Sequence, residues 1–585
     1  MDSISGGAMI ARMLQAEGVE VVFGIIDGSY FGLYSSLRDV GIRLVTPRHE
    51  TSAVHMAGAY ARLTGKLGVC IASNGPGAAN ALAGVAVESG EGNRVLLITS
   101  WRRSQIVNPD RGGTYQYFDQ TAVIRPMSKW SEAAESFDRV PELTRRALRQ
   151  CYIGRPGVVH LCVPEDIVNG EFPYEASDVL SPERYRRTSR SAAPEVLVRE
   201  AADLLMQAER PMIHAGSGVL HAHATAELRE LAELLKAPVT TSWSARDVID
   251  ERSPVSIPMN LLDLNTRVRN DADVVLALGT RFGETDWWGK VPYWRSPDEQ
   301  QLIQVDLDED ALGQNKPVDV AVVADIKAFS SALLAELKGR TASPKLAGRQ
   351  TRLQEYLSER EKGHAVLGEM LERETDLVHS ARVPSICRDV FSDDAVLVAD
   401  GGNTSVWANM FHEIRAPHSM LSTYKFGMLG AGIGQALAAK VAFPARDVYC
   451  VIGDGAMGFH SQEIETAVRN DLPVTFLVLC DRQWGMVKVN QEIALDPQKT
   501  LTDGELPADQ TINTDLDETR FDLLAESMGA LGVRVSRNED LEPAIRRCKD
   551  SGRVCVIHVD VDRVAHKFAP HLAEFKQMHA EPGSA

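Results

Sequence analysis

Two aspartates follow two strongly apolar segments of the sequence, with a helix-length stretch between them. Asp454 lies between two glycines after the apolar run 448–452, and Asp481 comes after the apolar run 474–479. Ligands of parallel sheets collect at the carboxyl ends of strands, and a helix expected at 461–469 would offer free N–H groups to phosphate. Two carboxylates, a loop carbonyl and phosphate oxygens complete an octahedral Mg²⁺ shell. The spacing therefore predicts a metal-bridged diphosphate site; the alternative is a GDG turn with Asp481 as a helix cap.

The composition is that of a long, ordinary globular chain. It has 585 residues, 44% of them hydrophobic and 24% charged, and this length predicts two to four domains. The net charge of −18 makes nucleic acid and anionic membranes poor partners. No apolar run approaches the roughly 20 residues that span a bilayer, and the first residues lack a signal-peptide pattern, so we expect a cytoplasmic protein. The eight cysteines are scattered and form no CxxC pair, which argues against a zinc site and against a disulfide framework.

Short apolar runs alternate with helical patterns along nearly the whole chain. Continuous apolar runs between helices are typical of parallel strands buried on both faces, so the predicted fold class is α/β, repeated several times. Polar segments at 172–193 and 339–382 predict linkers, the second with the composition of a surface helix. The runs expected as strands are 19–23, 68–72, 95–99, 158–162, 211–214, 274–278, 302–305, 396–398, 448–452, 474–479 and 554–559.

The order of features around Asp454 resembles a known motif. The chain has a strand, the GDG segment, a helix, a second strand, a two-residue polar step and then Gly485-Met486. This order resembles the thiamin diphosphate (ThDP) motif of the acetolactate synthase, pyruvate oxidase and 2-oxo acid decarboxylase group. The motifs are closest to the acetolactate synthase large subunit. The resemblance implies three consecutive doubly wound parallel-sheet domains: pyrimidine-binding (1–175), central Rossmann-like (190–340) and diphosphate-binding (375–570).

The resemblance also implies the cofactor contacts. Mg²⁺ would bind the side chains of Asp454 and Asp481 and the backbone carbonyl of Gln483. The family usually has two asparagines where this chain has Cys480-Asp481, so an additional negative charge lies beside the diphosphate. The residues implied to contact ThDP are Gly75, Pro76, Asn80, Gly402, Asn403, Thr404, Gly427, Met428, Leu429, Gly453, Asp454, Gly455, Ala456, Asp481, Gln483, Trp484, Gly485 and Met486.

A glutamate at the aminopyrimidine is a further requirement of ThDP chemistry. The segment 44–50, which ends in Arg48-His49-Glu50 before a helix rich in small residues, resembles the strand–RHE–helix of the family. A glutamate favoured in its protonated form by an apolar pocket exchanges a proton with the pyrimidine ring, and Glu50 is the candidate. The alternative is an acid that interacts with the helix dipole.

The bent conformation of the cofactor needs a bulky apolar side chain between small neighbours. The segment 426–432 resembles the glycine-flanked wedge of the family, with Leu429 under the rings and the Gly427 carbonyl facing the 4′-amino group. The alternative is a dinucleotide fingerprint at 430–434. Its spacing is GxGxG rather than GxGxxG, and 422–425 is a poor preceding strand.

The implied reaction is decarboxylation of pyruvate or a related 2-oxo acid, with transfer of the acyl-anion equivalent to a carbonyl acceptor. By resemblance Tyr115 and Gln116 face the active site, Lys129 lies at its entrance and Arg281 binds the carboxylate of the 2-oxo acid. Asp27 stands where the family has a neutral turn, and we expect it to be a proton donor or a helix cap.

Departures from the synthase pattern leave the reaction open. Asn490 replaces a tryptophan that is expected shortly after the Gly-Met-Val segment 485–487. The central segment 257–260 lacks the usual glycine-rich loop of the family. Tight binding of FAD is therefore not expected, although FAD stays open as a cofactor. The alternatives are a simple 2-oxo acid decarboxylase, a sulfoacetaldehyde acetyltransferase-like enzyme and a non-catalytic ThDP-binding partner subunit. The family combines Glu50 and the GDG motif from different subunits, which implies a homodimer or homotetramer.

Overall fold

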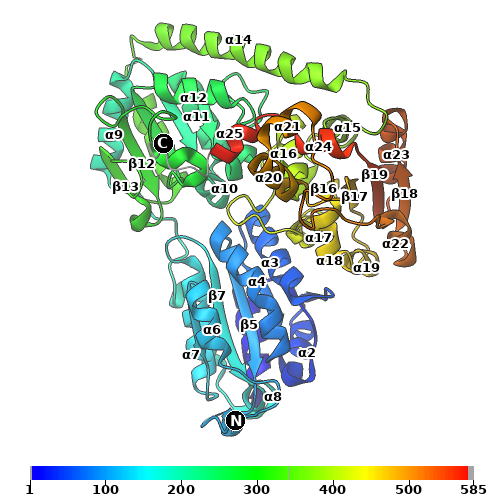
Figure 1. Cartoon of the computed structure of the whole chain (residues 1–585). Helices are drawn as coiled ribbons and strands as arrows, with labels where there is room; N and C mark the ends of the chain where they lie inside the picture. The colour runs from blue at the N-terminus through cyan, green and yellow to red at the C-terminus, as the bar shows by residue number, and fades with distance from the viewer. Residues whose placement is uncertain (1–2, 108, 342, 578–585) are drawn as a thin grey trace. The chain divides into compact units, whose positions relative to one another are not determined.

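The computed structural model of the chain describes residues 3–577 apart from residues 108 and 342 (Figure 1). The chain forms two compact units. Unit 1 consists of Met1–Ser189, Gly430–Ala445 and Phe459–Val474, and unit 2 of Arg190–Leu429, Arg446–Gly458 and Thr475–Ala585. Among the described residues, no helix is both long and apolar enough to cross a membrane.

Unit 1 contains a six-stranded sheet in the order β3-β2-β4-β5-β7-β6, in which every pair of neighbours is parallel. The central strands are buried along their whole length, as expected for a parallel sheet covered on both faces. The order reverses between β2 and β4, which is where such sheets bind ligands. The strands are β2 (Val21–Gly24), β3 (Arg43–Val45), β4 (Gly68–Ala72), β5 (Val95–Trp101), β6 (Trp130–Ala133) and β7 (Val158–Pro164).

Two small-residue helices, α3 (Glu50–Thr64) and α4 (Pro76–Glu91), pack closely in unit 1. A Cβ added at Gly58 of α3 would lie 1.8 Å from a carboxylate oxygen of Glu88 on α4. Glu88 is fully buried, and its carboxylate accepts from His55 at 2.7 Å and from Asn93 at 2.6 Å. The other helices of unit 1 include α1 (Gly6–Ala16), α2 (Phe31–Asp39), α7 (Arg139–Tyr152), α17 (Ala431–Ala442) and α19 (Glu463–Arg469).

The first predicted linker, 172–193, is fixed to unit 1 at its beginning. β8 (Glu171–Pro173) pairs antiparallel with β1 (Ser3–Ser5), and the Arg186 guanidinium lies 2.6 Å from the buried carboxylate of Glu17. The second predicted linker contains α14 (Leu346–Leu371), the long yellow-green helix of Figure 1. A helix was expected there because the segment is rich in charged residues.

Unit 2 contains two further parallel sheets. The five-stranded sheet has the order β10-β9-β11-β12-β13 and the six-stranded sheet the order β15-β14-β16-β17-β19-β18. The first consists of β9 (Pro211–Ala215), β10 (Val239–Thr241), β11 (Val274–Leu278), β12 (Gln301–Asp306) and β13 (Val320–Val323). The second consists of β14 (Val396–Asp400), β15 (Met420–Leu421), β16 (Val448–Gly453), β17 (Thr475–Cys480), β18 (Leu531–Val535) and β19 (Cys555–Asp560).

The structure confirms the predicted α/β class with three successive parallel sheets, and each apolar run expected as a strand overlaps one. The domain limits stay a prediction. The helix expected at 461–469 is present as α19 (Glu463–Arg469), and a further helix that had not been predicted, α18 (Asp454–His460), precedes it. The strands that had not been predicted, such as β10 and β15, are short.

Candidate cofactor and metal site

Two carboxylates, of the half-buried Asp454 and the buried Asp481, meet at the carboxyl ends of β16 and β17, which are parallel neighbours. Asp454 is the first residue of α18; its carboxylate accepts from the Gly455 N–H at 2.7 Å and from the Arg482 N–H at 2.8 Å. Asp481 directly follows β17. Burial and then the charge of Asp481 raise the pKa of Asp454, and burial raises the pKa of Asp481. A divalent cation between them would relieve both costs.

Hydrogen bonds to Arg563 and Thr514 fix the loop that follows Asp481. Gln483 donates through Nε2 to the Asp481 carboxylate at 3.1 Å and to the Arg563 carbonyl at 2.7 Å. The Trp484 N–H donates to the Thr514 carbonyl at 2.7 Å. This network fixes the loop that carries the backbone carbonyl of Gln483, which stays the predicted third metal ligand.

Three glycines form a narrow cradle around the carboxylates. A Cβ at Gly455 would lie 2.8 Å from the ring of Trp484, and one at Gly402 would lie 2.8 Å from Met486. A Cβ at Gly485 would lie 2.8 Å from the Asn403 amide nitrogen and 2.9 Å from an Asp481 oxygen. Side chains at these positions would displace the groups expected to bind the cofactor.

Asn403 is the clearest sign that this site is built to bind a polar ligand. It is 4% exposed, and neither its amide nitrogen nor its amide oxygen has a hydrogen-bond partner in the part of the chain that the structure describes. A buried polar group without a partner costs about 1–3 kcal/mol, so the position is adapted to something polar that binds beside Asp481. Asn403 lies in the first turn of α16 (Gly402–Phe411), where the N–H groups of a helix favour an anion.

A cavity of about 370 Å³ opens at the carboxyl end of β14. Gly401 there has a φ of 98°, and a Cβ on it would lie 3.2 Å from the Gly453 nitrogen, so the cavity adjoins the GDG segment. The sheet order reverses between β14 and β16 at this point. The lining brings together predicted residues from three distant segments: Gly402; Gly427, Met428 and Leu429; and Met486.

The other predicted cofactor residues belong to unit 1. Glu50 is the first residue of α3, and one of its carboxylate oxygens accepts from the Asn80 amide at 3.0 Å. The other oxygen lies 3.2 Å from the Cβ position of Gly77, in the turn that Gly75 and Pro76 begin. The structure thus joins Glu50 to the segment that carries the predicted cofactor contacts Gly75, Pro76 and Asn80.

Asp27 and Gln116 also lie in unit 1, at the ends of its central strands. The Asp27 carboxylate accepts from the Ser29 N–H at 2.8 Å, which is the predicted cap. Burial and then the charges of Asp27 and Glu50 raise the pKa of Tyr30, so both carboxylates lie near one phenol. Gln116 has a φ of 54°, and its carbonyl accepts from the Asn74 amide at 3.0 Å.

Lys129 and Arg281 lie away from these groups within their own units. Lys129 precedes β6 at the amino edge of the sheet and donates to the Arg155 carbonyl at 2.9 Å. The predicted site residues of unit 1 follow the carboxyl ends of strands, and the position expected for Lys129 at the entrance of the active site stays a prediction. Arg281 is half-buried in unit 2 and lines a separate cavity.

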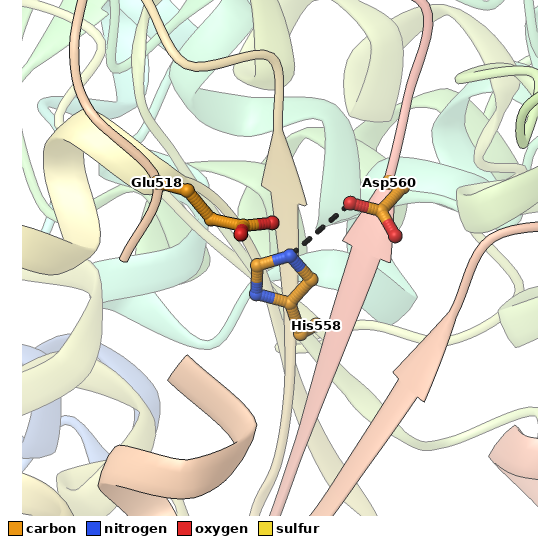
Figure 2. Close-up of side chains that lie close together, drawn as sticks. All are labelled: Glu518, His558 and Asp560. Carbon is orange, nitrogen blue, oxygen red and sulfur yellow. Dashed lines mark hydrogen bonds and ion pairs between the residues drawn. The ribbon is translucent and has the colours of Figure 1, made fainter. Parts of the chain in front are cut away.

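The sequence did not predict a further cluster of acidic residues and a histidine in unit 2, which Figure 2 shows. His558 and Asp560 project from the same face of β19, with His558 Nε2 3.3 Å from an Asp560 oxygen, and Glu518 approaches them from a loop. Their ligand atoms lie within 4.8 Å of one another. Arg534 donates to Asp560 at 2.8 and 3.0 Å and to Glu518 at 2.8 Å. Because a guanidinium already binds both carboxylates, we assign this cluster to stability rather than to a metal.

Comparison with known proteins settles the family. Residues 4–123, 198–333 and 400–559 match, in this order, the N-terminal TPP binding domain, the central domain and the C-terminal TPP binding domain of thiamine pyrophosphate enzymes. The chain belongs to the thiamine pyrophosphate enzyme family. Thiamine pyrophosphate is another name for ThDP, so the predicted family and the predicted ThDP dependence are confirmed.

Relatives of this ThDP enzyme carry two different names. An acetolactate synthase of Mycobacterium bovis is 29% identical over 553 residues, which cover 94% of this chain and 86% of the relative. The acetolactate synthase isozyme 3 large subunit of Escherichia coli is 26% identical over 578 residues, covering 97% and 96%. A sulfoacetaldehyde acetyltransferase of Alcaligenes xylosoxydans xylosoxydans is 29% identical over 580 residues, covering 93% and 91%. Membership of the acetolactate synthase group therefore does not fix the reaction.

Proposed function

We propose that this ThDP enzyme is a Mg²⁺-dependent lyase or carboligase. It would decarboxylate pyruvate or a related 2-oxo acid and transfer the acyl-anion equivalent to a carbonyl acceptor. The observation that carries the proposal is the pair of the half-buried Asp454 and the buried Asp481, beside the Asn403 amide, which has no hydrogen-bond partner among the described residues. Carboxylate oxygens suit Mg²⁺, and an amide beside a helix N-terminus suits phosphate.

The residues present fit ThDP and Mg²⁺. Asp454, Asp481 and the backbone carbonyl of Gln483 would hold the metal. Gly402, Asn403 and Thr404 would bind the diphosphate, since they supply the first N–H groups of α16. The cofactor supplies, when bound, a centre that stabilises a carbanion.

The chain's own residues would orient the cofactor and transfer one proton to and from its pyrimidine ring. Leu429 and Gly427 line the cavity and would support its bent form. Glu50 would exchange a proton at the pyrimidine ring, and its carboxylate is held in one orientation by the Asn80 amide at 3.0 Å. Asp27 and Gln116 would face the substrate, and Arg281 would bind its carboxylate as a planar guanidinium.

Replacement of Glu50 tests the proposal. In Glu50→Gln we expect CO₂ release from pyruvate or another 2-oxo acid to fall by about 10²–10⁴, the usual contribution of a proton-transfer group. ThDP binding, measured by calorimetry, should persist because Gln has the same shape. Glu465→Gln, on the partly exposed face of α19, is the control and should match the wild type. Normal turnover of Glu50→Gln would refute this mechanism.

A second candidate is favoured by the relative named sulfoacetaldehyde acetyltransferase, which is as similar as the first synthase. Product analysis decides between the two. With pyruvate and an added aldehyde, a carboligase gives a new carbon–carbon bond. A sulfoacetaldehyde acetyltransferase-like enzyme would instead consume sulfoacetaldehyde without pyruvate. An aldehyde as the product of pyruvate alone would indicate simple decarboxylation.

A further inference from the structure

A histidine of unit 2 lies between two buried hydroxyl groups. His566 belongs to the short helix α24 (Arg563–Lys567), close to the red end of the chain in Figure 1, and is 2% exposed. Its Nδ1 lies 2.7 Å from the hydroxyl oxygen of Ser380, and its Nε2 lies 3.2 Å from the hydroxyl oxygen of Thr404. Ser380 and Thr404 are themselves 4% and 3% exposed. The three side chains therefore form a chain of hydrogen bonds away from bulk water.

One end of this chain of hydrogen bonds reaches the proposed diphosphate site. Thr404 lies in the first turn of α16, and its hydroxyl oxygen is 3.0 Å from the Cβ position of Gly453, the residue before Asp454. The other end is Ser380, which precedes α15 (Arg382–Val390). His566 is 162 residues from Thr404 and 186 residues from Ser380 in the sequence, so local structure does not impose these contacts.

Other contacts already fix α24 in place. The Asp562 carboxylate caps the helix by accepting from two of its N–H groups at 2.9 and 2.7 Å. The backbone carbonyl of His566 accepts from the Trp407 indole N–H at 2.8 Å, and Lys567 pairs with the buried carboxylate of Glu492 at 2.6 Å. The helix does not need the ring nitrogens of His566 to hold it, so these nitrogens are free to orient the two hydroxyl groups.

The protonation of the His566 ring decides the direction of these hydrogen bonds. Burial lowers the pKa of His566 to about 3, so the ring is neutral and carries a single N–H. With the proton on Nδ1, the ring donates to Ser380, and the Thr404 hydroxyl donates its own proton to Nε2. With the proton on Nε2, the ring donates to the Thr404 oxygen, and the hydroxyl proton of Thr404 is left to donate to a ligand.

An ionised diphosphate favours the second arrangement, because its oxygens only accept hydrogen bonds. In the first arrangement Thr404 would present lone pairs to the anion. In the second, Ser380 donates to Nδ1, Nε2 donates to Thr404, and Thr404 donates to a phosphate oxygen. Hydrogen bonds to a charged acceptor are the stronger ones, and each bond in such a series polarises the next.

We infer that His566 is a positioning residue whose Nε2–H makes the Thr404 hydroxyl a hydrogen-bond donor to the diphosphate of the cofactor. This inference rests on the proposed function, in which Gly402, Asn403 and Thr404 bind that diphosphate. No proton is transferred in this role, because the ring only fixes the direction in which the Thr404 hydroxyl points.

Two substitutions at His566 separate the roles of its two nitrogens. Gln places an amide nitrogen near the position of Nε2, whereas Asn reaches only the position of Nδ1. ThDP is titrated into each protein in the presence of Mg²⁺ and without substrate, and calorimetry gives the dissociation constant. We expect His566→Asn to weaken ThDP binding about ten-fold, the weight of one hydrogen bond to a charged group. His566→Gln should stay within about three-fold of the wild type.

A double-mutant cycle with Thr404→Val distinguishes this role from a general effect on the fold. In the Thr404→Val background, His566→Asn and His566→Gln should bind ThDP equally, because the hydroxyl that His566 orients is gone. Equal ThDP affinities of His566→Asn and the wild type would overturn the inference. A ten-fold difference between the two variants that persists in Thr404→Val would also overturn it, since His566 would then act through the fold.

The ring proton is located directly in the wild type, which keeps the inference testable if a variant does not fold. Solid-state NMR of protein labelled with ¹⁵N at histidine Nε2 distinguishes a protonated nitrogen from a bare one, and the signal lost in either His566 variant belongs to His566. With ThDP and Mg²⁺ bound we expect a protonated Nε2, and a bare Nε2 would refute the inference. Failure of the wild type to take up ThDP would refute the proposed function and the inference together, whereas uptake that His566→Asn leaves unchanged refutes the inference alone.

Discussion

Asp454 and Asp481 form a pair whose pKa values both lie above the usual range, because burial disfavours two negative charges held close together. Before metal uptake the pair retains protons at a pH where an exposed aspartate has none. Mg²⁺ needs both carboxylates deprotonated, so uptake must release protons. We expect the affinity for Mg²⁺ at saturating ThDP to fall as the pH is lowered from 8 to 6, by up to about ten-fold per pH unit for each proton released.

Calorimetry in buffers with different ionisation enthalpies measures both the affinity and the protons released. In Asp481→Asn one titrating partner is gone, and the removal of its charge lowers the pKa of Asp454, so the affinity should depend less on pH. A Mg²⁺ affinity that is constant from pH 6 to 8 in the wild type would show that the pair binds no proton in the metal-free protein.

Gly485 illustrates how little space the pair leaves. We expect Gly485→Ala to weaken binding of ThDP and Mg²⁺ by about 10–100-fold, since the new methyl group would displace the Asn403 and Asp481 side chains 2.8 and 2.9 Å away. Gly458→Ala is the matched control, because a Cβ there meets nothing within 4 Å. Similar cofactor affinities for the two variants would argue against this cradle.

At the scale of elements, the N-terminus of α3 is held by a carboxylate from α19. Glu463 is fully buried and accepts from the Arg48 N–H at 2.9 and 3.1 Å and from the Thr466 hydroxyl at 2.7 Å. These bonds fix the backbone two residues before Glu50, so Glu463 is a positioning residue. We expect Glu463→Gln to lower kcat about ten-fold with little change in ThDP affinity, since a neutral amide replaces a charge-assisted acceptor.

A double-mutant cycle identifies the route of this effect. In a Glu50→Gln background, Glu463→Gln should cause no further loss of CO₂ release, because both changes act on the same proton transfer. Amide exchange at Arg48 should be faster in Glu463→Gln than in Glu465→Gln, which changes only a side-chain pair with Arg48 at 3.5 Å. Additive losses in the cycle would show that Glu463 acts on stability alone.

Local patterns allowed much of this arrangement to be predicted. Asp454 and Asp481 each follow a strand directly, and Glu50 comes shortly after β3, so sequence order was enough to place them near strand ends. The helix that begins at Asp454 was not predicted, because Gly455 and Gly458 are poor helix formers and packing against Trp484 overrides that preference.

Contacts between distant segments could not be predicted in this way. Glu463 and Arg48 are separated by 415 residues, and no local pattern marks the pair. The sequence around Lys425 indicates only a poor strand, yet packing places Lys425 in the same cavity wall as Arg281. That Asn403 has no hydrogen-bond partner among the described residues depends on the packing of distant segments around it, which no local pattern encodes.

At the scale of the whole molecule, the groups required for the proposed reaction are divided between two compact units. Glu50 belongs to unit 1, whereas Asp454 and Asp481 belong to unit 2. Resemblance to the family implies that one active site takes Glu50 from one subunit and the GDG segment from another. We therefore propose that a homodimer is the smallest active form and that it is built from two identical, shared sites.

Mixing two inactive variants tests this sharing. Glu50→Gln and Asp454→Asn each damage both sites of a homodimer. In a mixed dimer, one site receives both damaged groups and the other receives neither. Random assembly makes half of the dimers mixed, so co-expression of the two variants should restore up to about a quarter of wild-type activity. Two different affinity tags would allow the mixed dimers to be isolated, and these should reach about half. If the isolated mixed dimers are as inactive as the parents, each site is built from a single chain.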